Sequence, residues 1–469
     1  MLNKEFEPKK FHFIGIGGVG MSGLAKYLLQ MGAEVSGSDK SSGKYCEMVK
    51  KLGGTVYEDH RAENVPANSM VVLSTAVKED NPELIRAKEL DCGILHRSEL
   101  LKLISMGFGT DGAQKFIGFA GTHGKTTTSG LCSYVLNKAG VDASYVVGGL
   151  VPEFATNADF KENGKFFVAE LDESDGSIVK YSPNTVVINN LEADHPDFYK
   201  NGLVDVIATF KEFLSNIKPD AKVLLGTDSP GCCDLMKACP ERKYVTYGLT
   251  SGDYRAENVV CGAEETHFDI TYKGEKLCEM SLSLIGEHNV YNALAVAAAI
   301  RENGVDLNLV KPFFKDFTGM GRRFQKVEEF DGIKIFDDYA HHPSEVKATL
   351  CSAKKVKPAQ GRIVTIFQPH RYTRFGTFWN EFLKTFEDTD KLIVVDVFSA
   401  GDEPSEKFNS ENFVKQINHK DAVYVSGSIQ EAAKKILPIL KKNDIVITMG
   451  AGDITKAGKY LAEQWDKQK

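Results

Sequence analysis

The stretch that decides the fold is residues 115–130, KFIGFAGTHGKTTTSG, in which an apolar strand runs into a glycine-rich turn and then into a helix. Backbone N–H groups at the start of such a helix can cradle a phosphate, while Lys125 can neutralise a terminal phosphate and Thr126 can bind Mg²⁺. The turn differs from the usual phosphate loop because only two residues separate Gly121 from Gly124. We therefore expect a strand, a phosphate-binding loop and a helix at this point of the chain.

Length and composition are those of a large globular protein. The 469 residues correspond to about three domains at roughly 150 residues per domain. The 57 basic and 64 acidic residues give a net charge of -7 and no basic run stands out, so nucleic acid is not an expected partner. No stretch approaches the roughly 18 apolar residues that a membrane span needs. We expect a cytoplasmic protein without a membrane span, and the sequence sets no oligomeric state.

Apolar strand-like runs alternate with amphipathic helical stretches along nearly the whole chain, which is typical of parallel sheets joined by crossover helices. The sequence therefore predicts an α/β fold of three domains. They are a Rossmann-like N-terminal domain over 1–107, a central P-loop ATPase-like domain with a mostly parallel sheet over 108–321, and a C-terminal Rossmann-like α/β domain over 322–469. The first boundary rests on Gly107, Gly109 and Gly112.

The first domain opens with a glycine motif, Gly15-Ile-Gly17-Gly18-Val-Gly20, which follows a strand expected over 11–16 and begins a helix. Asp39 lies at the end of the next strand, so the motif has the spacing and context of a dinucleotide-binding fingerprint. Its glycines would let the backbone approach any diphosphate at a helix N-terminus. Three interpretations are open: an NAD site, a site for another diphosphate, and a tight turn without a ligand.

Acidic groups and a histidine follow two strands of the central domain. The strand Phe166–Glu170 ends in a carboxylate and precedes Asp172, Glu173 and Asp175, while the strand over 185–190 is followed by Asp194 and His195. Because the carboxyl ends of parallel strands meet at one edge of a sheet, we expect Glu170 and His195 near the phosphate loop as metal ligands. The alternative is a solvated acidic turn.

Two further groups of residues are candidates for nucleotide and anion binding. Asn289 and Asn292 share one face of a helix and their amides suit an adenine edge, although helix capping would also explain Asn289. In the last third, arginines and histidines cluster at strand ends in GRRF, DDYAHHP and QPHRYTR, before a helix expected over 378–386. On an acidic chain these local cations favour anionic ligands over a surface ion-pair network.

Together these segments resemble the Mur ligases, ATP-dependent enzymes that add amino acids to the UDP-sugar precursor of peptidoglycan. The resemblance covers essentially the whole chain, because GTHGKTTT, AELDESDGS, NNLEADH, GEHNVYNALA, GMGRRFQ, DDYAHHPSEV and QPHRYTR occur in family order. The beginning, FHFIGIGGVGMSGLA, is similar to that of the family member that adds alanine. No single motif is decisive, but the ordered set is specific.

The resemblance implies a role for each matching residue. It implies ATP binding by Gly121, Thr122, His123, Gly124, Lys125, Thr126, Thr127, Asn289, Asn292, Arg323 and one of Asp337 and Asp338. It implies metal binding by Thr126, Glu170 and His195, and UDP-sugar binding by Gly15, Gly17, Gly18, Gly20, Asp39, Ser74, His96 and Arg97. Alanine and the sugar-linked carboxylate would be positioned by Tyr339, His341, Arg371 and Arg374. The groups expected to act in the reaction are Lys125, Glu170, His195, His341 and Arg371.

The implied reaction adds L-alanine to UDP-N-acetylmuramate through an acyl phosphate made with ATP, and Mg²⁺, or Mn²⁺ in its place, is the implied metal. Such a ligase would serve cell-wall synthesis, cell shape and cell division. The closest alternative is a recycling ligase that attaches a preformed tripeptide to the same sugar. An NAD-dependent oxidoreductase would leave the phosphate loop idle, and a non-catalytic nucleotide switch would not need the cationic clusters.

Overall fold

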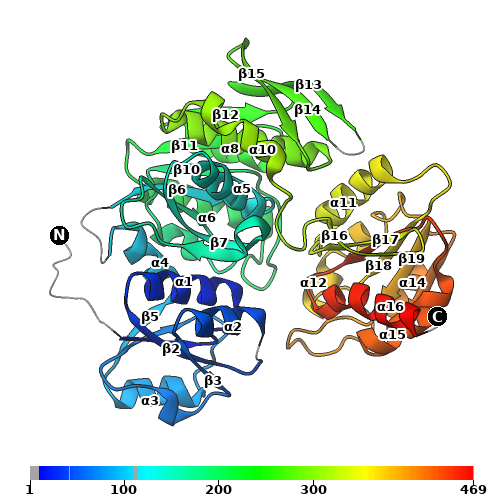
Figure 1. Cartoon of the computed structure of the whole chain (residues 1–469), viewed down its shortest axis with the longest axis horizontal. Coiled ribbons are helices and arrows are strands. Elements are labelled where there is room, and N and C mark those ends of the chain that lie inside the picture. The colour runs from blue at the N-terminus through cyan, green and yellow to red at the C-terminus, as the bar shows by residue number, and fades with distance from the viewer. Residues whose placement is uncertain (1–9, 42, 109–112, 263–264, 468–469) are drawn as a thin grey trace.

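The computed structural model describes residues 10–41, 43–108, 113–262 and 265–467, and it contains three sheets with helices packed against them (Figure 1). The sheets lie within residues 10–96, 115–282 and 325–449, and the predicted α/β class is confirmed. Gly109 and Gly112, which support the first predicted boundary, lie outside the described residues. Within the described ranges, none of the helices combines the length and apolar character needed to cross a membrane.

The N-terminal sheet has parallel strands in the order β3-β2-β1-β4-β5. Its elements are β1 (Lys10–Ile14), α1 (Val19–Gln30), β2 (Glu34–Asp39), α2 (Lys44–Lys51), β3 (Thr55–Glu58), β4 (Met70–Leu73), α3 (Pro82–Glu89), β5 (Gly93–His96) and α4 (Arg97–Ser105). The prediction that the first strand continues to residue 16 is wrong. The strand ends at Ile14 because Gly15, with a φ of 82°, turns the chain toward α1.

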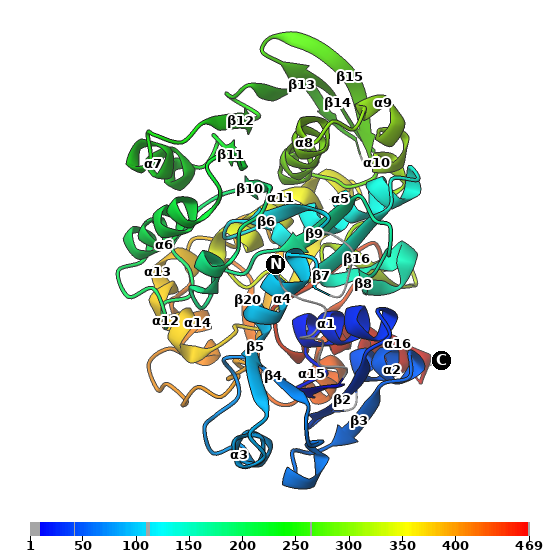
Figure 2. The ribbon, with the colours of Figure 1, turned by 90° about the vertical axis from the view of Figure 1, so that its left-hand side faces the viewer.

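The central sheet has the order β15-β14-β13-β12-β11-β10-β6-β9-β7-β8. Its strands are β6 (Lys115–Ala120), β7 (Ala143–Val151), β8 (Thr156–Asp159), β9 (Phe166–Glu170), β10 (Thr185–Ile188), β11 (Lys222–Gly226), β12 (Tyr244–Gly248), β13 (Tyr254–Cys261), β14 (Thr266–Tyr272) and β15 (Glu275–Leu282). Its helices are α5 (Lys125–Lys138), α6 (Leu203–Asn216), α7 (Pro230–Ala238), α8 (Glu287–Glu302), α9 (Leu307–Val310) and α10 (Pro312–Asp316). The adjacent strands β12, β11, β10, β6, β9 and β7 pair in parallel, as predicted, whereas β8 at the edge is antiparallel to β7. The antiparallel meander β13–β15 extends this sheet away from the N-terminal domain (Figure 2) and was not predicted.

The C-terminal sheet has the order β16-β17-β21-β18-β19-β20, with only β16 antiparallel to its neighbour among the described strands. Its elements are β16 (Gln325–Phe330), β17 (Ile333–Asp338), α11 (Pro343–Val356), β18 (Ile363–Phe367), α12 (Tyr372–Thr377), α13 (Trp379–Phe382), β19 (Lys391–Val395), α14 (Ser410–Gln416), β20 (Ala422–Val425), α15 (Ile429–Ile436), β21 (Ile445–Met449) and α16 (Ala457–Asp466). The single helix predicted over 378–386 is wrong. Only α13 lies within this range, and it ends at Phe382 because the following residues form a tighter turn, in which the N–H of Thr385 donates to the carbonyl oxygen of Phe382 at 3.1 Å.

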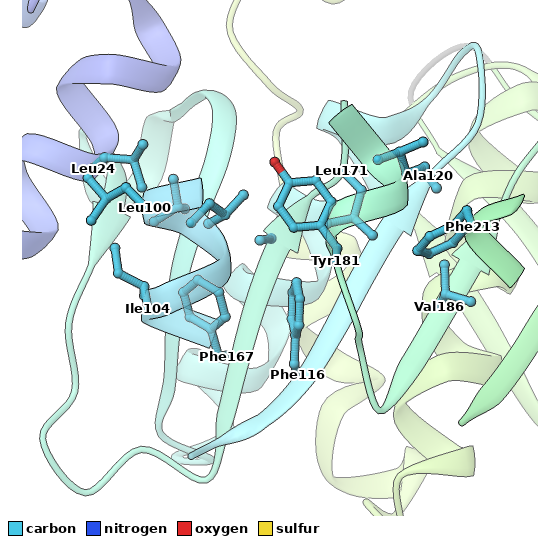
Figure 3. Close-up of a cluster of buried hydrophobic side chains, with 14 of the residues drawn as sticks. Leu24, Leu100, Ile104, Phe116, Ala120, Phe167, Leu171, Tyr181, Val186 and Phe213 are labelled. Carbon is cyan, nitrogen blue, oxygen red and sulfur yellow. The ribbon is translucent and has the colours of Figure 1, made fainter. Parts of the chain in front are cut away.

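The N-terminal and central domains share one apolar core. Leu24 of α1 and Leu100 and Ile104 of α4 belong to the same buried cluster as Phe116 of β6 and Phe167 of β9 (Figure 3). Removal of this apolar surface from water favours a fixed arrangement of the two domains.

The C-terminal domain has a core of its own. Its two apolar clusters cover the two faces of its sheet and contain only residues from 324 to 465. The contacts with the central domain that are described below are ion pairs and hydrogen bonds, and polar interfaces of this kind permit relative domain movement.

A buried lysine lies at the boundary between the N-terminal and central domains. Lys26 of α1 is 1% exposed, and its Nζ donates a hydrogen bond of 2.7 Å to Oγ1 of Thr156 on β8. Burial lowers the pKa of Lys26 to about 8, and nearby Asp159 opposes this shift only in part. Protonated Lys26 therefore carries a desolvation cost at neutral pH.

We expect Lys26→Met to raise the free energy of unfolding by about 1–3 kcal/mol at pH 7. The folded-state pKa lies below the unfolded value of 10.5, so the cost is present in full below pH 8 and is relieved between pH 8 and 10.5. The gain should therefore shrink by pH 10, as measured by urea denaturation at both pH values. The exposed Lys51→Met is the matched control. A destabilised Lys26→Met protein with a pH-independent difference would contradict this account.

Candidate functional site

The phosphate loop between β6 and α5 lies in the middle of the central sheet. β6 is hydrogen-bonded to β10 on one side and to β9 on the other, and all three strands run in parallel. The turn after Glu170 and the segment after Ile188 therefore flank the loop at the carboxyl edge, where ligands bind in open α/β sheets. The predicted proximity of these segments follows from this strand order.

Two glycines of the loop have conformations that a larger residue would strain. Gly124 precedes α5 with a φ of 82°, and Gly121 has a φ of 117°. A Cβ atom at Gly121 would lie 2.7 Å from the carbonyl oxygen of Asn190. The backbone N–H of His123 donates to Oδ1 of Asn190 at 2.8 Å, so the segment after β10 holds the loop in place.

Lys125 is neutralised within the loop region. Its Nζ donates to the carbonyl oxygens of Gly121 and Thr122, at 2.6 and 2.9 Å, and lies 2.9 Å from Oε2 of Glu173. Burial raises the pKa of Glu173 to about 7, against the opposing effect of Lys125. The sequence marks Glu173 only as one acid of the turn after β9, and the structure identifies it as the carboxylate that pairs with the loop lysine.

Thr126 and Glu170 form the oxygen-rich part of the predicted metal site. Thr126 Oγ1 donates to Oε2 of Glu170 at 2.9 Å, and the backbone N–H of Gly148 donates to the same oxygen at 3.1 Å. Hydroxyl and carboxylate oxygens are the ligands that Mg²⁺ prefers, so this pair fits the implied metal. His195, the third predicted ligand, has its Nε2 3.7 Å from Glu173, the partner of the loop lysine.

A pocket of about 220 Å³ lies between the central and C-terminal domains. Several residues predicted to bind ATP line it: His123, Gly124, Thr127, Asn289, Asn292, Arg323 and Asp338. Leu284 and Met320 add apolar surface, and Tyr291 adds an aromatic ring. Polar amides, a phosphate loop and an apolar wall together suit a purine nucleotide.

The two adjacent aspartates at the end of β17 have different surroundings. Asp338 lines the pocket, accepts from the backbone N–H of Phe324 at 2.8 Å, and has its pKa raised to about 6 by burial. Asp337 instead accepts from Arg322 Nε at 3.1 Å and from the hydroxyls of Thr448 and Thr455. Of the two, the structure brings only Asp338 into the pocket.

Glu345, which the sequence presents only as a helix residue, connects the phosphate loop to the C-terminal domain. Its Oε1 lies 3.3 Å from Nδ1 of His123 and 3.4 Å from Nη1 of Arg323. Its Oε2 accepts from the backbone N–H groups of His341 and His342 at the start of α11. Burial alone would lower the pKa of His123, but Glu192 and Glu345 outweigh it and raise the pKa to about 9. The sequence feature that could have drawn attention to Glu345 is its position in the capping box of α11.

Two arginines of the C-terminal domain pair with aspartates that follow β10 in the central domain. Arg374, 7% exposed, lies 3.1 Å from Oδ1 of Asp194, and its Nη2 donates to Nδ1 of His195 at 3.4 Å. Arg371 pairs with Asp197 across the same interface and with Asp402 within its own domain. Both predicted arginines therefore reach the segment that carries His195.

His341 and Tyr339 follow β17 in the same domain as these arginines. His341 Nδ1 is 2.9 Å from the carbonyl oxygen of Tyr339, and burial lowers the pKa of His341 to about 4. The guanidinium groups of Arg322 and Arg323 lie 4.8 and 5.5 Å from the centre of the Tyr339 ring. His341 is thus held neutral near physiological pH, with Nε2 available to a ligand.

A larger pocket, of about 920 Å³, lies in the N-terminal domain. Gly15, Gly18, Asp39 and Ser74 line it, as predicted for one ligand site, together with Lys40, His60, Arg61 and Lys78. These basic groups, which the sequence analysis did not identify, suit an anionic ligand. Gly17 is not among the residues that line the pocket, but its N–H donates to Oδ2 of Asp39, which does line it, at 2.9 Å.

The remaining predicted residues of this domain, His96 and Arg97, face the central domain instead of lining the pocket. Arg97 pairs with Asp172 and lies 3.8 Å from Asp175, and His96 Nε2 is 3.8 Å from Asp175. A Cβ atom at Gly20 would lie 3.8 Å from Arg97. These contacts join the start of α1 to the acidic turn beside the phosphate loop.

Comparison of the sequence with known families gives three matches that follow one another along the chain. They are the Mur ligase family, catalytic domain, over 10–108, the Mur ligase middle domain over 119–300, and the Mur ligase, glutamate ligase domain, over 322–452. The chain is 41% identical to a UDP-N-acetylmuramate–L-alanine ligase of Geotalea daltonii over 97% of this chain and 98% of that protein.

Solved structures give the same result for the fold. The UDP-N-acetylmuramate–alanine ligase of Thermotoga maritima superposes with a TM-score of 0.81 at 30% identity, covering 98% of this chain and all of that one. A murein peptide ligase of Psychrobacter arcticus has a TM-score of 0.72 at 23% identity, covering 97% and 98% of the two chains. The predicted three-domain architecture is thereby confirmed.

A double-mutant cycle on the unfolding free energy should separate the two arginine pairs. We expect the cycle of Arg374→Met and Asp194→Asn to give a coupling energy of at least about 2 kcal/mol, because either single change leaves a buried charge unpaired. The cycle of Arg371→Met and Asp197→Asn, on a pair whose side chains are 34% and 45% exposed, should give about 0–1 kcal/mol. Equal coupling energies would show that burial does not distinguish the pairs.

Proposed function

Because the chain belongs to the Mur ligase family, we propose that it adds L-alanine to UDP-N-acetylmuramate with consumption of ATP, in the synthesis of the peptidoglycan precursor. The observation that carries this proposal is its near-full-length similarity to alanine-adding ligases. The two pockets also support this proposal. The pocket between the central and C-terminal domains would take ATP, and the pocket of the N-terminal domain would take the larger, anionic sugar nucleotide.

Each domain has one task in this proposal. Residues 1–107 hold the UDP part of the sugar nucleotide, residues 108–321 hold ATP, and residues 322–469 close over both and bring the amino acid. The shared apolar core holds the first two domains in a fixed arrangement. The polar interface lets the third domain open and close.

ATP occupies the pocket between the central and C-terminal domains. Its phosphates lie along Gly121–Thr127, where backbone N–H groups and the α5 N-terminus face them. Asn289 and Asn292 bind the adenine edge, while Arg323 and Asp338 hold the nucleotide from the C-terminal side. Lys125 exchanges Glu173 and the two loop carbonyls for a phosphate oxygen, so its charge acts on the group that is transferred.

In the first step, the lactyl carboxylate of the sugar attacks the γ-phosphorus of ATP. An acyl phosphate forms and ADP leaves, which converts a poor electrophile into a reactive one. Lys125 lowers the barrier by absorbing negative charge on the phosphoryl oxygens. Thr126, Glu170 and His195 would hold Mg²⁺, which when bound would neutralise phosphate charge.

In the second step, the neutral amine of alanine attacks the acyl carbon, inorganic phosphate leaves, and the nitrogen loses a proton. The tetrahedral oxyanion that precedes departure needs nearby donors, which Arg371 supplies. The neutral His341 has its Nδ1–H directed at the carbonyl oxygen of Tyr339, so its Nε2 can accept a proton from the amine. Arg374 and Tyr339 position the carboxylates of the two substrates. Domain closure keeps water from the acyl phosphate.

The amino-acid preference tests this function directly. In an ADP-release assay with UDP-N-acetylmuramate and Mg²⁺, we expect L-alanine to give the fastest turnover and the tripeptide of the recycling reaction to give none above background. Lys125→Met should reduce the L-alanine rate by at least about a hundredfold in a protein that remains folded by circular dichroism, because it removes charge stabilisation in the transition state. The melting temperature should fall, since the buried Glu173 loses its partner. A preference for the tripeptide would assign the chain to the recycling reaction.

The glycine motif of the first domain should affect one substrate only. A Cβ atom at Gly17 would lie 2.8 Å from Oδ2 of Asp39 and 2.9 Å from Sγ of Cys46, so Gly17→Val must shift the pocket wall. We expect the KM for UDP-N-acetylmuramate to rise by about tenfold or more and the KM for ATP to stay within about twofold.

The control is Gly43→Ala in the same domain, where an added Cβ meets no atom within 4 Å. Titration of the parent with NAD completes the test. Saturable NAD binding that Gly17→Val abolishes, with unchanged sugar-nucleotide kinetics, would refute the UDP assignment.

A further inference from the structure

Three side chains beside the phosphate loop have the donor set of a transition-metal site. One ligand atom from each of His123, Glu192 and His342 lies within 4.8 Å of the other two. Nε2 of His123 is 3.5 Å from Oε2 of Glu192, and Nδ1 of His342 is 3.9 Å from the same oxygen. The rings of the two histidines have their centres 4.9 Å apart.

These separations are close to those of a tetrahedral site. With bonds of about 2.0–2.1 Å to nitrogen and oxygen, the ligand atoms around zinc lie about 3.3 Å apart. Shifts of about 0.2 and 0.6 Å would bring the two carboxylate–imidazole separations to that value, and the two imidazole nitrogens, which lie within 4.8 Å of each other, would have to approach as well. Two imidazoles with one carboxylate select Zn²⁺ and similar ions over Mg²⁺, which prefers oxygen ligands alone.

The cluster also has the supporting contacts that metal-binding histidines need. Nδ1 of His123 faces Oε1 of Glu345 at 3.3 Å, which directs Nε2 toward Glu192. Oγ of Ser344 donates to Oε2 of Glu192 at 2.9 Å and fixes that carboxylate. His342 is 6% exposed, and its Nδ1, the atom nearest Glu192, lies 2.7 Å from Oγ of Ser344 and accepts from the Ser344 N–H at 3.4 Å. Because the same Oγ lies 3.1 Å from Nε2 of His123, an ion bound to the three side chains replaces hydrogen bonds that Ser344 makes with them.

The local charge favours a cation at this point. The two carboxylates beside His123, those of Glu192 and Glu345, are the reason its pKa rises despite burial. A divalent ion that replaces the proton on His123 would meet the same carboxylates.

The three residues come from two domains. His123 belongs to the phosphate loop and Glu192 to the segment after β10, while His342 caps α11 of the C-terminal domain. His123 and Glu192 also line the nucleotide pocket, as does Ser344. An ion at this point therefore links the two domains and changes the wall of the pocket.

We propose that His123, Glu192 and His342 bind a zinc-class divalent ion that bridges the central and C-terminal domains and opposes nucleotide binding. The opposition to nucleotide rests on the proposed function, whereas the metal site itself does not. A zinc-class ion would thus weaken nucleotide binding at the phosphate loop, whereas Mg²⁺ would support it.

The test is Zn²⁺ binding to the full chain without nucleotide, measured by competition with a chromophoric chelator, with Co²⁺ absorption as a second probe. We expect one saturable site and the intense visible bands of tetrahedral Co²⁺. His342→Ala and Glu192→Gln should each weaken Zn²⁺ binding by at least about tenfold, because each removes one ligand. Glu192→Gln keeps the volume of the side chain, so its result does not depend on a cavity.

The matched control is His267→Ala, which removes an exposed histidine 3.6 Å from Glu265 on the distant meander and should leave the Zn²⁺ affinity unchanged. Absence of saturable binding, or parental affinity in both ligand variants, would overturn the site.

The effect on nucleotide binding is tested by measuring the affinity for each ligand, Zn²⁺ or ADP, with and without the other. Saturating ADP with Mg²⁺ should weaken Zn²⁺ binding by at least about fivefold, and Zn²⁺ should weaken ADP binding by the same factor. Equal affinities with and without the other ligand would overturn the opposition. A chain that binds Zn²⁺ as expected but does not join L-alanine to the sugar would refute the proposed function and leave the metal site standing.

Discussion

The position of β6 between β9 and β10 is the constraint on which the rest of the structure depends. Parallel pairing on both sides forces the loop after β6 to lie between the turn that follows Glu170 and the segment that leads to His195. Every later contact uses this arrangement: Glu173 reaches Lys125, Asn190 holds the loop backbone, and the C-terminal domain meets the same edge. A different strand order would disperse these groups even with every local motif intact.

The two domain boundaries differ in their physical chemistry, and this difference divides the molecule into a fixed part and a movable part. Apolar side chains of α1 and α4 continue into the central core, so separation of the first two domains would expose that surface to water. The third domain meets the centre through charged partners such as Arg374 and Asp194, which water and substrate carboxylates can replace. The molecule is therefore stiff between its first two domains and adaptable where the third domain meets the phosphate loop.

Local patterns predicted the strands, the phosphate loop and most of the pocket, because periodicity and glycine spacing are properties of short segments. The contacts of Glu345 with His123 and of Glu192 with Ser344 were not predicted, since each joins the central and C-terminal domains: Ser344 and Glu192 are 152 residues apart. The choice between Asp337 and Asp338 depends on the β17 pleat, which turns neighbouring side chains to opposite faces. The helix predicted over 378–386 was too long because a run of apolar residues does not reveal that the chain turns after Phe382.

Glu345 divides its two oxygens between different tasks. Oε2 completes the first turn of α11, while Oε1 holds His123 and Arg323. A glutamine would have a single acceptor oxygen for both tasks, and an aspartate is shorter by a methylene. A substitution at this position therefore disturbs domain closure and the first turn of α11 together. Closure can be adjusted separately at His123 and Arg323, whose side chains have no part in starting α11.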